Sequence, residues 1–252
     1  MTGSTVFVGP ALVAVLVVLV AVAVVAAVVG RLGVGRDTAT AAARATVQLA
    51  AVSAVIVVVV RSLWAAAAFV LVMVTTATLT SARRMTRDRS GLLAALPIGA
   101  GTAVVLALVL ASGVVPLTGI AVVPVGGIVI GGTMTATSLA GRRALDELTA
   151  RRGEYEAALS LGLLDRDAAL EVIRLTASQA LVPALDQTRT VGLVTLPGAF
   201  VGVLIGSGDP VQAGAAQLLV LAGLLAAESI AVVIVVELVA RGRVRRPTPA
   251  PP

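Results

Sequence analysis

One carboxylate stands inside a long apolar run near the end of the sequence. Glu228 lies within residues 211–240, where almost every other side chain is aliphatic. An ionisable group in such a setting is energetically costly and is by default a functional candidate. Glu228 could neutralise a passing cation or carry a proton, or it could simply stay protonated. Glu237 lies one turn before Arg241, and this spacing predicts an ion pair at the edge of the run.

A second group of polar side chains, residues 134–138, reads Met-Thr-Ala-Thr-Ser inside another apolar run. The thioether of Met134 could be a weak ligand for a soft or borderline cation, with hydroxyl oxygens beside it. Alternatively, the hydroxyls donate to carbonyls of their own helix. Gln48 has a similar position in an earlier run. The candidate residues for a cation pathway are Gln48, Met134, Thr135, Thr137, Ser138 and Glu228.

Composition excludes several other chemistries. The sequence contains neither Cys nor His, so thiolate and imidazole metal sites and imidazole acid–base catalysis are ruled out. All 19 basic residues are Arg, and a P-loop needs Lys to reach the phosphates. We therefore predict no catalytic residue and no cofactor bound by this chain. If ATP and Mg²⁺ are used, a partner chain binds them. The sequence does not identify metal ligands.

The elements that position these residues are predicted to be membrane spans. The chain has 252 residues, 58% of them hydrophobic and only 13% charged, and several runs reach the roughly 20 apolar residues that cross a bilayer. We predict an all-α, polytopic transmembrane bundle in the cell membrane. Residues 1–246 would form one transmembrane domain and the Pro-rich residues 247–252 a disordered tail. The seven predicted spans are about 6–29, 41–60, 63–80, 92–112, 117–140, 191–205 and 211–240.

Arginines set the predicted orientation of these spans. They cluster after spans one, three, five and seven, and only Arg61 falls on the opposite side. Because positive charge favours the cytoplasmic side, the N-terminus is predicted outside and the C-terminus in the cytoplasm.

Residues 142–187 are then the one large predicted cytoplasmic insert. They read as two short helices joined by Gly162 in a left-handed cap, with Asp165 as the N-cap of the second and Pro183 ending or bending it. The first helix carries Glu-Tyr-Glu-Ala-Ala, and small alanines beside a charge suit a knob that enters a cleft on a partner. An ordinary surface helix is the alternative, because Glu-Ala-Ala is common in an Ala-rich chain. The candidate docking residues are Glu154, Glu156, Ala157, Ala158 and Gly162.

Glycines at intervals of four residues predict close helix packing in lipid. They occur in span five at Gly127 and Gly131, and span six carries Pro197 as a possible break. The glycines of span six are Gly198, Gly202 and Gly206.

The spacing of Glu156, Ala157, Ala158 and Gly162 resembles the coupling loop of many ATP-binding cassette permeases. Three stretches, residues 44–49, 132–148 and 188–210, resemble the FetB-type permeases in particular. These are membrane subunits of a metal (iron) exporter whose ATPase is a separate chain, and plant relatives are linked to aluminium tolerance. The resemblance covers most of the chain from Arg44 to about Val235. The sequence departs from the pattern at Gly132, where Asn is expected, at Val203, where Gln is common, and at Glu228, where small neutral residues are usual.

The resemblance implies the permease subunit of an ATP-binding cassette (ABC) transporter that exports a metal cation such as iron. It implies a homodimer, a separate ATPase docked on the insert, and no nucleic acid. The alternative is a stand-alone, ion-coupled secondary transporter with Glu228 as its coupling site.

Overall fold

The computed structural model describes residues 8–247, and helices occupy nearly all of them. No strand forms within this range, and the one isolated bridge joins Val191 and Thr195. The chain forms two compact units, Met1–Val58 and Val59–Pro252. The predicted all-α class is confirmed.

Unit 1 contains α1 (Pro10–Val29) and most of α2 (Gly35–Arg61). Pro10 starts α1, where its fixed φ and missing N–H cost nothing, and Asp37 in the first turn of α2 complements the helix dipole. The apolar side chains of α1 are almost all exposed. A helix that is apolar all round suits a lipid environment.

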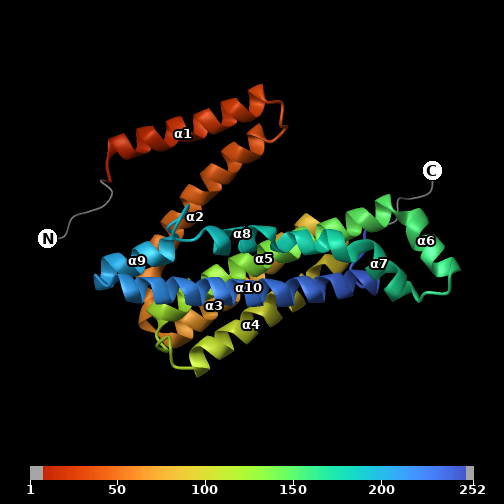
Figure 1. Ribbon diagram of the computed structural model, residues 1–252. Helices are drawn as coiled ribbons and strands as arrows, with labels where there is room; N and C mark the ends of the chain where they lie inside the picture. The colour runs from red at the N-terminus through yellow and green to blue at the C-terminus, as the bar shows by residue number, and fades with distance from the viewer. Residues whose placement is uncertain (1–7, 248–252) are drawn as a thin grey trace. The chain divides into compact units, whose positions relative to one another are not determined.

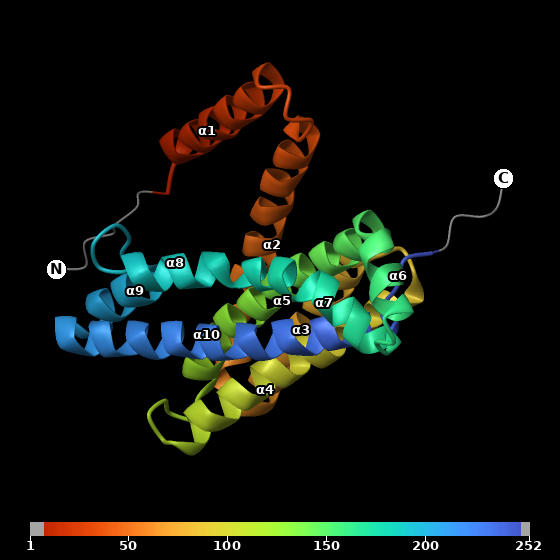
Figure 2. The same cartoon turned by 45° about the vertical axis from the view of Figure 1, so that its right-hand side comes forward.

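Unit 2 is a bundle built around α10 (Pro210–Ala240) and α5 (Gly119–Ala150) (Figures 1 and 2). The segments α7 (Asp165–Ser178) and α8 (Val182–Thr190) run beside both in the two views, and α7 contacts both. Asp209 caps α10 by accepting hydrogen bonds from the backbone N–H groups of Val211 and Gln212. The remaining elements are α3 (Leu63–Met85), the 3₁₀ turn η1 (Arg89–Ala94), α4 (Ala95–Ala111), α6 (Arg152–Ser160), the 3₁₀ turn η2 (Gln179–Leu181) and α9 (Gly198–Ser207).

Small residues bring the central helices of unit 2 into close contact. A Cβ added to Gly101 of α4 would lie 2.5 Å from the carbonyl oxygen of Ala227 in α10. A Cβ added to Gly141 of α5 would collide with the sulfur of Met85 in α3. Such crossings provide van der Waals contact, which replaces the hydrophobic effect as the packing force in lipid.

Within residues 8–247, seven helices are long and apolar enough to cross a membrane, as predicted. Six of them match the predicted spans, but the predicted sixth span, 191–205, is wrong. Residues 191–197 form a turn in which the Thr190 carbonyl accepts from the N–H groups of Leu193 and Val194, so only the ten-residue α9 follows. The sixth long apolar segment is instead Asp165–Thr190.

Residues 142–187, the predicted insert, are divided among the end of α5, the elements α6, α7 and η2, and the start of α8. α5 continues without interruption to Ala150. Arg151 lies between α5 and α6 and has a non-helical conformation. Leu164, not Asp165, is the N-cap of α7, and Asp165 lies in its first turn. Pro183 is the second residue of α8, which follows the η2 turn, in agreement with the predicted bend. The predicted Pro-rich tail lies outside the described residues from position 248 onward.

Candidate functional site

Glu228 lines a cavity of about 310 Å³ that lies wholly within unit 2. The wall includes Gly132 and Thr135 of α5, Ala184 and Gln187 of α8, and Glu228 of α10. About 18 Å of helix rise separates Glu228 from the last residue of α10, so the carboxylate lies well inside the apolar segment. α8, which the sequence placed in the insert, therefore forms one side of this site.

The Glu228 side chain is only 8% exposed and has no neutralising neighbour. The cavity lining contains no arginine, and the ion pairs formed by the described residues do not include Glu228. Leaving a carboxylate desolvated and unpaired costs several kcal/mol. The carboxylate therefore requires a proton or a cation from outside the protein.

Gly132 provides the space that Glu228 occupies. A Cβ at position 132 would lie 2.5 Å from Oε1 of Glu228 and 2.5 Å from Cδ2 of Leu224. The adjacent Gly131 differs, because an added Cβ there would meet no described atom within 4 Å. Two of the positions where the sequence departs from the FetB-type pattern, Gly132 and Glu228, thus face each other across α5 and α10.

The other predicted pathway residues are only partly brought to this cavity. The Thr135 hydroxyl lines it and donates to the Gly131 carbonyl at 3.0 Å. Ser138 donates to the Met134 carbonyl at 2.7 Å and pairs with the Ser81 hydroxyl, also at 2.7 Å. Ser138 therefore has the structural role that was left open for it.

Met134, Thr137 and Gln48 are not part of the cavity. Met134 packs against the main hydrophobic core, so its thioether is not offered to a cation there. The Thr137 hydroxyl is buried with no hydrogen-bond partner among the described residues. Gln48 lies on α2 in unit 1.

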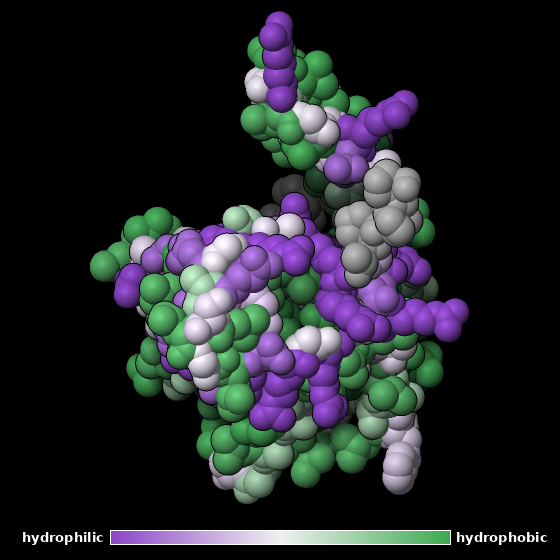
Figure 3. Space-filling view, turned by 90° about the vertical axis from the view of Figure 1, so that its right-hand side faces the viewer, coloured by the Kyte–Doolittle hydropathy of each residue, from purple (hydrophilic) through white to green (hydrophobic). Residues whose placement is uncertain are grey.

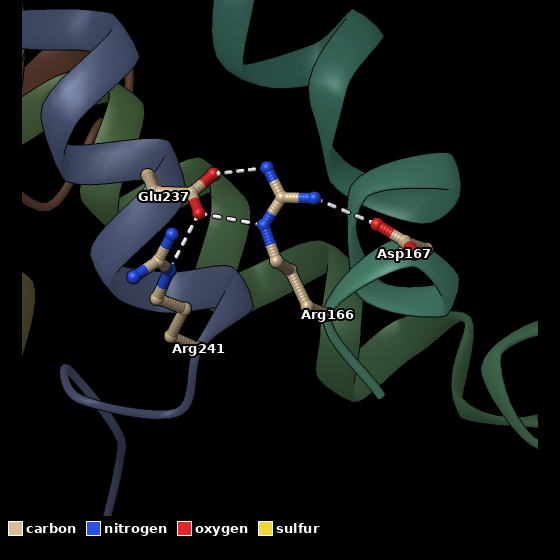
Figure 4. A network of polar contacts seen from close by, with 4 residues as sticks. All are labelled: Arg166, Asp167, Glu237 and Arg241. Carbon is tan, nitrogen blue, oxygen red and sulfur yellow. Dashed lines mark hydrogen bonds and ion pairs between the residues drawn. The ribbon is translucent and has the colours of Figure 1, made fainter. Parts of the chain in front are cut away.

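A charged network joins the start of α7 to the end of α10 (Figure 4). Arg166 donates two hydrogen bonds to Glu237, Nε to Oε1 at 2.6 Å and an Nη to Oε2 at 2.9 Å. The predicted pair is confirmed, since Arg241 Nε also donates to Glu237 Oε1 at 2.6 Å. Arg166 further donates to Asp167 at 2.7 Å. The fork of a guanidinium on a carboxylate fixes the geometry of both partners, so this network connects the end of α10 to α7.

The candidate docking residues lie on α6 and the turn that follows it. Arg151 donates to Glu154 and also to the Val172 carbonyl of α7, at 3.3 Å for the latter. The Arg151 guanidinium holds the pKa of the Glu154 carboxyl below its usual value. Arg152 donates to Glu156 at 2.8 Å. Gly162 has φ = +91°, which is the predicted left-handed conformation and one that β-branched residues rarely adopt.

Exposed leucines flank this glycine at an otherwise polar end of unit 2. Leu161 is 83% exposed and Leu164 is 73% exposed. Figure 3 looks onto this end and shows hydrophilic residues gathered over it with hydrophobic ones among them. Beside α6 lies a cavity of about 870 Å³, whose lining includes Tyr155 and Arg241. Apolar side chains within a polar rim are typical of a protein-binding surface.

Of the five glycines predicted to pack closely, only Gly127 has a close neighbour on another helix within the described chain. A Cβ at Gly127 would lie 2.9 Å from Cε of Met73. At Gly131, Gly198, Gly202 and Gly206 an added Cβ would meet no described atom within 4 Å. The prediction for α9 assumed a full-length span, whereas α9 is too short to cross another helix over several turns. Pro197 is the N-cap of α9 rather than a break within a helix.

Sequence reasoning missed three contributors to unit 2. Gln187 was taken as part of an insert, and Gln217 was passed over in the run that holds Glu228. The Gln217 side chain, which is buried, accepts a hydrogen bond from the backbone N–H of Phe200 at 3.2 Å and so connects α10 to α9. The third, Gly101, could have been found as a small residue within an apolar run.

Comparison with known proteins agrees with the resemblance seen in the sequence. The model of the family described as "Uncharacterised protein family (UPF0014)" matches residues 10–243. The UPF0014 membrane protein STAR2 of Oryza sativa subsp. japonica is 34% identical over 204 residues, covering 79% of this chain and 71% of that protein. The UPF0014 membrane protein YjkA of Bacillus subtilis is 29% identical over 209 residues, covering 81% and 83% respectively.

A third relative carries a name that states a function. The "Probable iron export permease protein FetB" of Escherichia coli is 32% identical over 140 residues, which are 56% of this chain and 53% of that protein. No solved structure matches the chain. With a family model that spans almost all of the described residues and seven long apolar helices, the chain belongs to the UPF0014 family and is a multi-pass membrane protein.

Proposed function

We propose that this chain is the permease subunit of an ABC transporter that exports a metal cation such as iron from the cytoplasm. ATP and Mg²⁺ would bind to a separate ATPase, and this chain would perform no covalent chemistry. Two copies of the chain would form the pathway. The similarity to FetB supports the cargo class and the direction.

The observation that carries the proposal is the exposed turn after α6. Leu161 and Leu164 present apolar surface beside Gly162, at the end of unit 2 that also carries the Arg166–Glu237 network. A solvated end of a monomer gains nothing from two exposed leucines, whereas a docked ATPase would bury them.

The proposed orientation places α6 and the C-terminus in the cytoplasm and the N-terminus outside. An odd number of spans puts the two ends of the chain on opposite sides, and seven long apolar helices are present. α6 follows α5 directly, and α7 and α8 then run back beside α10. A push on α6 would thus reach α7 through the Arg151–Val172 contact and α10 through Arg166.

The test is co-purification of the permease with its ATPase from the native membrane, followed by measurement of ATP hydrolysis in lipid. Gly162→Val strains a left-handed residue, and Glu156→Arg reverses the charge that α6 presents. Like-charge contact at an interface costs several kcal/mol. Both variants are expected to insert normally and to lose the bound ATPase.

Asp186→Arg is the matched control for Glu156→Arg, because it reverses an exposed carboxylate on α8 and not on α6. It is expected to retain the ATPase. If the Glu156→Arg, Gly162→Val double variant retains the ATPase as the wild type does, α6 is an ordinary surface helix and the docking proposal fails.

A stand-alone, ion-coupled transporter is the second candidate function, and the unpaired Glu228 carboxylate favours it. The ABC permease and the stand-alone transporter differ in the energy source that drives transport. Cation movement in proteoliposomes driven by an ion gradient, with no ATPase present, would favour the second candidate.

A further inference from the structure

We propose that the cavity at Glu228 is a binding site for a hard, partly hydrated metal cation, held by oxygen ligands. The identification of that cation as the cargo rests on the proposed function. The binding itself rests on the chemistry of the cavity and would hold for any mode of transport.

The side-chain atoms of the cavity lining that could ligate a metal cation are all oxygens. Glu228 supplies a carboxylate, Gln187 an amide oxygen, and Thr135 a hydroxyl whose proton is committed to the Gly131 carbonyl. Because that proton is engaged, the Thr135 oxygen can act toward a ligand only through its lone pairs. Carboxylate, amide and water oxygens suit Mg²⁺, Ca²⁺ and Mn²⁺, whereas soft cations prefer sulfur. The only thioether considered for this role, that of Met134, packs into the core.

The charge of Glu228 favours a positive ligand, because the buried carboxylate needs either a proton or a cation to neutralise it. Glu228 is buried, lines the cavity, and has no basic neighbour in it. A bound cation would remove the energetic cost of the uncompensated carboxylate. No basic side chain of the cavity lining competes with such a cation for Glu228.

The size of the cavity fits a cation that keeps part of its water. Its volume of about 310 Å³ leaves room for several water molecules beside a cation. A single carboxylate cannot replace the whole hydration shell of a divalent ion, so waters would complete the coordination.

The site is suited to transient binding rather than to permanent retention of a metal. Among the described residues, no three acidic, His or Cys side chains gather to hold an ion. A transported ion must be bound strongly enough to enter and weakly enough to leave. The same wall contains α8, which is continuous through η2 with α7 and hence with the Arg166–Glu237 network. Movement of α7 would therefore alter the cavity.

The test uses Mn²⁺ as the probe and the purified full-length permease in lipid nanodiscs, without any ATPase. Bound Mn²⁺ is measured by the loss of the free-ion electron paramagnetic resonance signal. The wild type is expected to bind Mn²⁺ saturably, and excess Mg²⁺ is expected to compete. Glu228→Gln keeps the side-chain volume and removes the charge, so it is expected to weaken binding by at least about tenfold.

Glycines of α5 provide a second variant with its own control. Gly132→Ala places a methyl group where Oε1 of Glu228 lies, and is expected to weaken Mn²⁺ binding. Gly126→Ala places the same group on the same helix but outside the cavity lining, where its nearest neighbour is 3.5 Å away, and is expected to bind as the wild type does. Glu171→Gln, which removes an exposed carboxylate of α7, is expected to be silent.

The proposal is overturned if the wild type binds no Mn²⁺ or if Glu228→Gln binds it as tightly as the wild type. It is also overturned if Gly126→Ala and Gly132→Ala weaken binding equally. None of these results involves the ATPase, so a failure here is distinct from a failure of docking at α6. Conversely, normal Mn²⁺ binding with no ATPase partner would leave the site standing and remove the ABC role.

Discussion

Two carboxylates on α10 have opposite surroundings. Glu228 is buried in a cavity without a partner, whereas Glu237, nine residues later, is held by Arg166 and Arg241. Around Glu228 the helix is fixed by packing, since Ala227 touches the backbone of α4 at Gly101. Around Glu237 it is fixed by exposed charges. Glu237 is therefore part of the structure, whereas Glu228 is the carboxylate for which we propose a transported cation as ligand.

The largest effect is expected where packing fixes the helix. Gly101→Leu would place a side chain against the Ala227 carbonyl, a backbone atom that cannot turn aside. Overpacking of this kind costs about 3 kcal/mol or more and should lower the thermal unfolding midpoint by roughly 10 °C. Size-exclusion chromatography and thermal unfolding in detergent would measure this.

Gly99→Leu is the control, because it lies on the same helix and an added Cβ meets no described atom within 4 Å. It should fold as the wild type does. Equal destabilisation by both changes would mean that α4 tolerates leucine at neither position. The close contact between Gly101 and Ala227 would then not explain the stability of this part of α10.

An intermediate effect is expected at the charged end. Glu237→Arg would place three guanidinium groups together and should lower the unfolding midpoint by a few degrees. Because the network is exposed, about 0.5 M salt should reduce the difference from the wild type. The added Arg166→Glu change would restore opposite charges and should recover most of the loss.

A Glu237→Arg midpoint that does not respond to salt, with no recovery in the double variant, would show that the network does not connect α7 to α10 through charge. The transmission route from α6 to α10 would then need another contact.

Most of this fold could be predicted from the sequence, because apolar runs of about 20 residues define spans directly. Six of the seven long helices follow from that rule. The sixth failed because residues 191–205 are apolar enough but contain a turn before Pro197. Residues 165–190 carry charges along the segment, including Glu171 and Arg174, and therefore read as a soluble insert. Composition alone does not show in which apolar segment the helix is interrupted by a turn.

The candidate site was predictable only in part. Glu228 could be identified because a lone carboxylate in an apolar run is conspicuous. Its surroundings could not be, since Gln187 and Gly132 lie far from it in sequence and meet it only through helix packing. The packing of Met134 against the core could not be predicted either, because the sequence shows which residues share a helix but not which way each side chain faces.

The smallest effect is expected at the Arg151–Glu154 pair, which is exposed to water. The hydrogen bond from Arg151 lowers the pKa of the Glu154 carboxyl below its usual 4.5. The pair therefore stabilises the folded state above pH 4.5, and this contribution is lost as the pH falls through the lowered pKa. Glu154→Gln should lower the unfolding midpoint by about 1 °C or less at pH 7. Measured between neutral and acid pH, the difference should vanish in acid; a difference that grows in acid would mean the pair does not stabilise the fold.

The central claim is that Glu228 serves a cation that the permease moves with energy from its ATPase. It is tested most directly by ATP-dependent Mn²⁺ transport in proteoliposomes that contain the permease with its co-purified ATPase. The account predicts saturable transport by the wild type and a loss of at least about tenfold in Glu228→Gln, with the ATPase still bound and its basal activity unchanged. Transport by Glu228→Gln at the wild-type rate would contradict it.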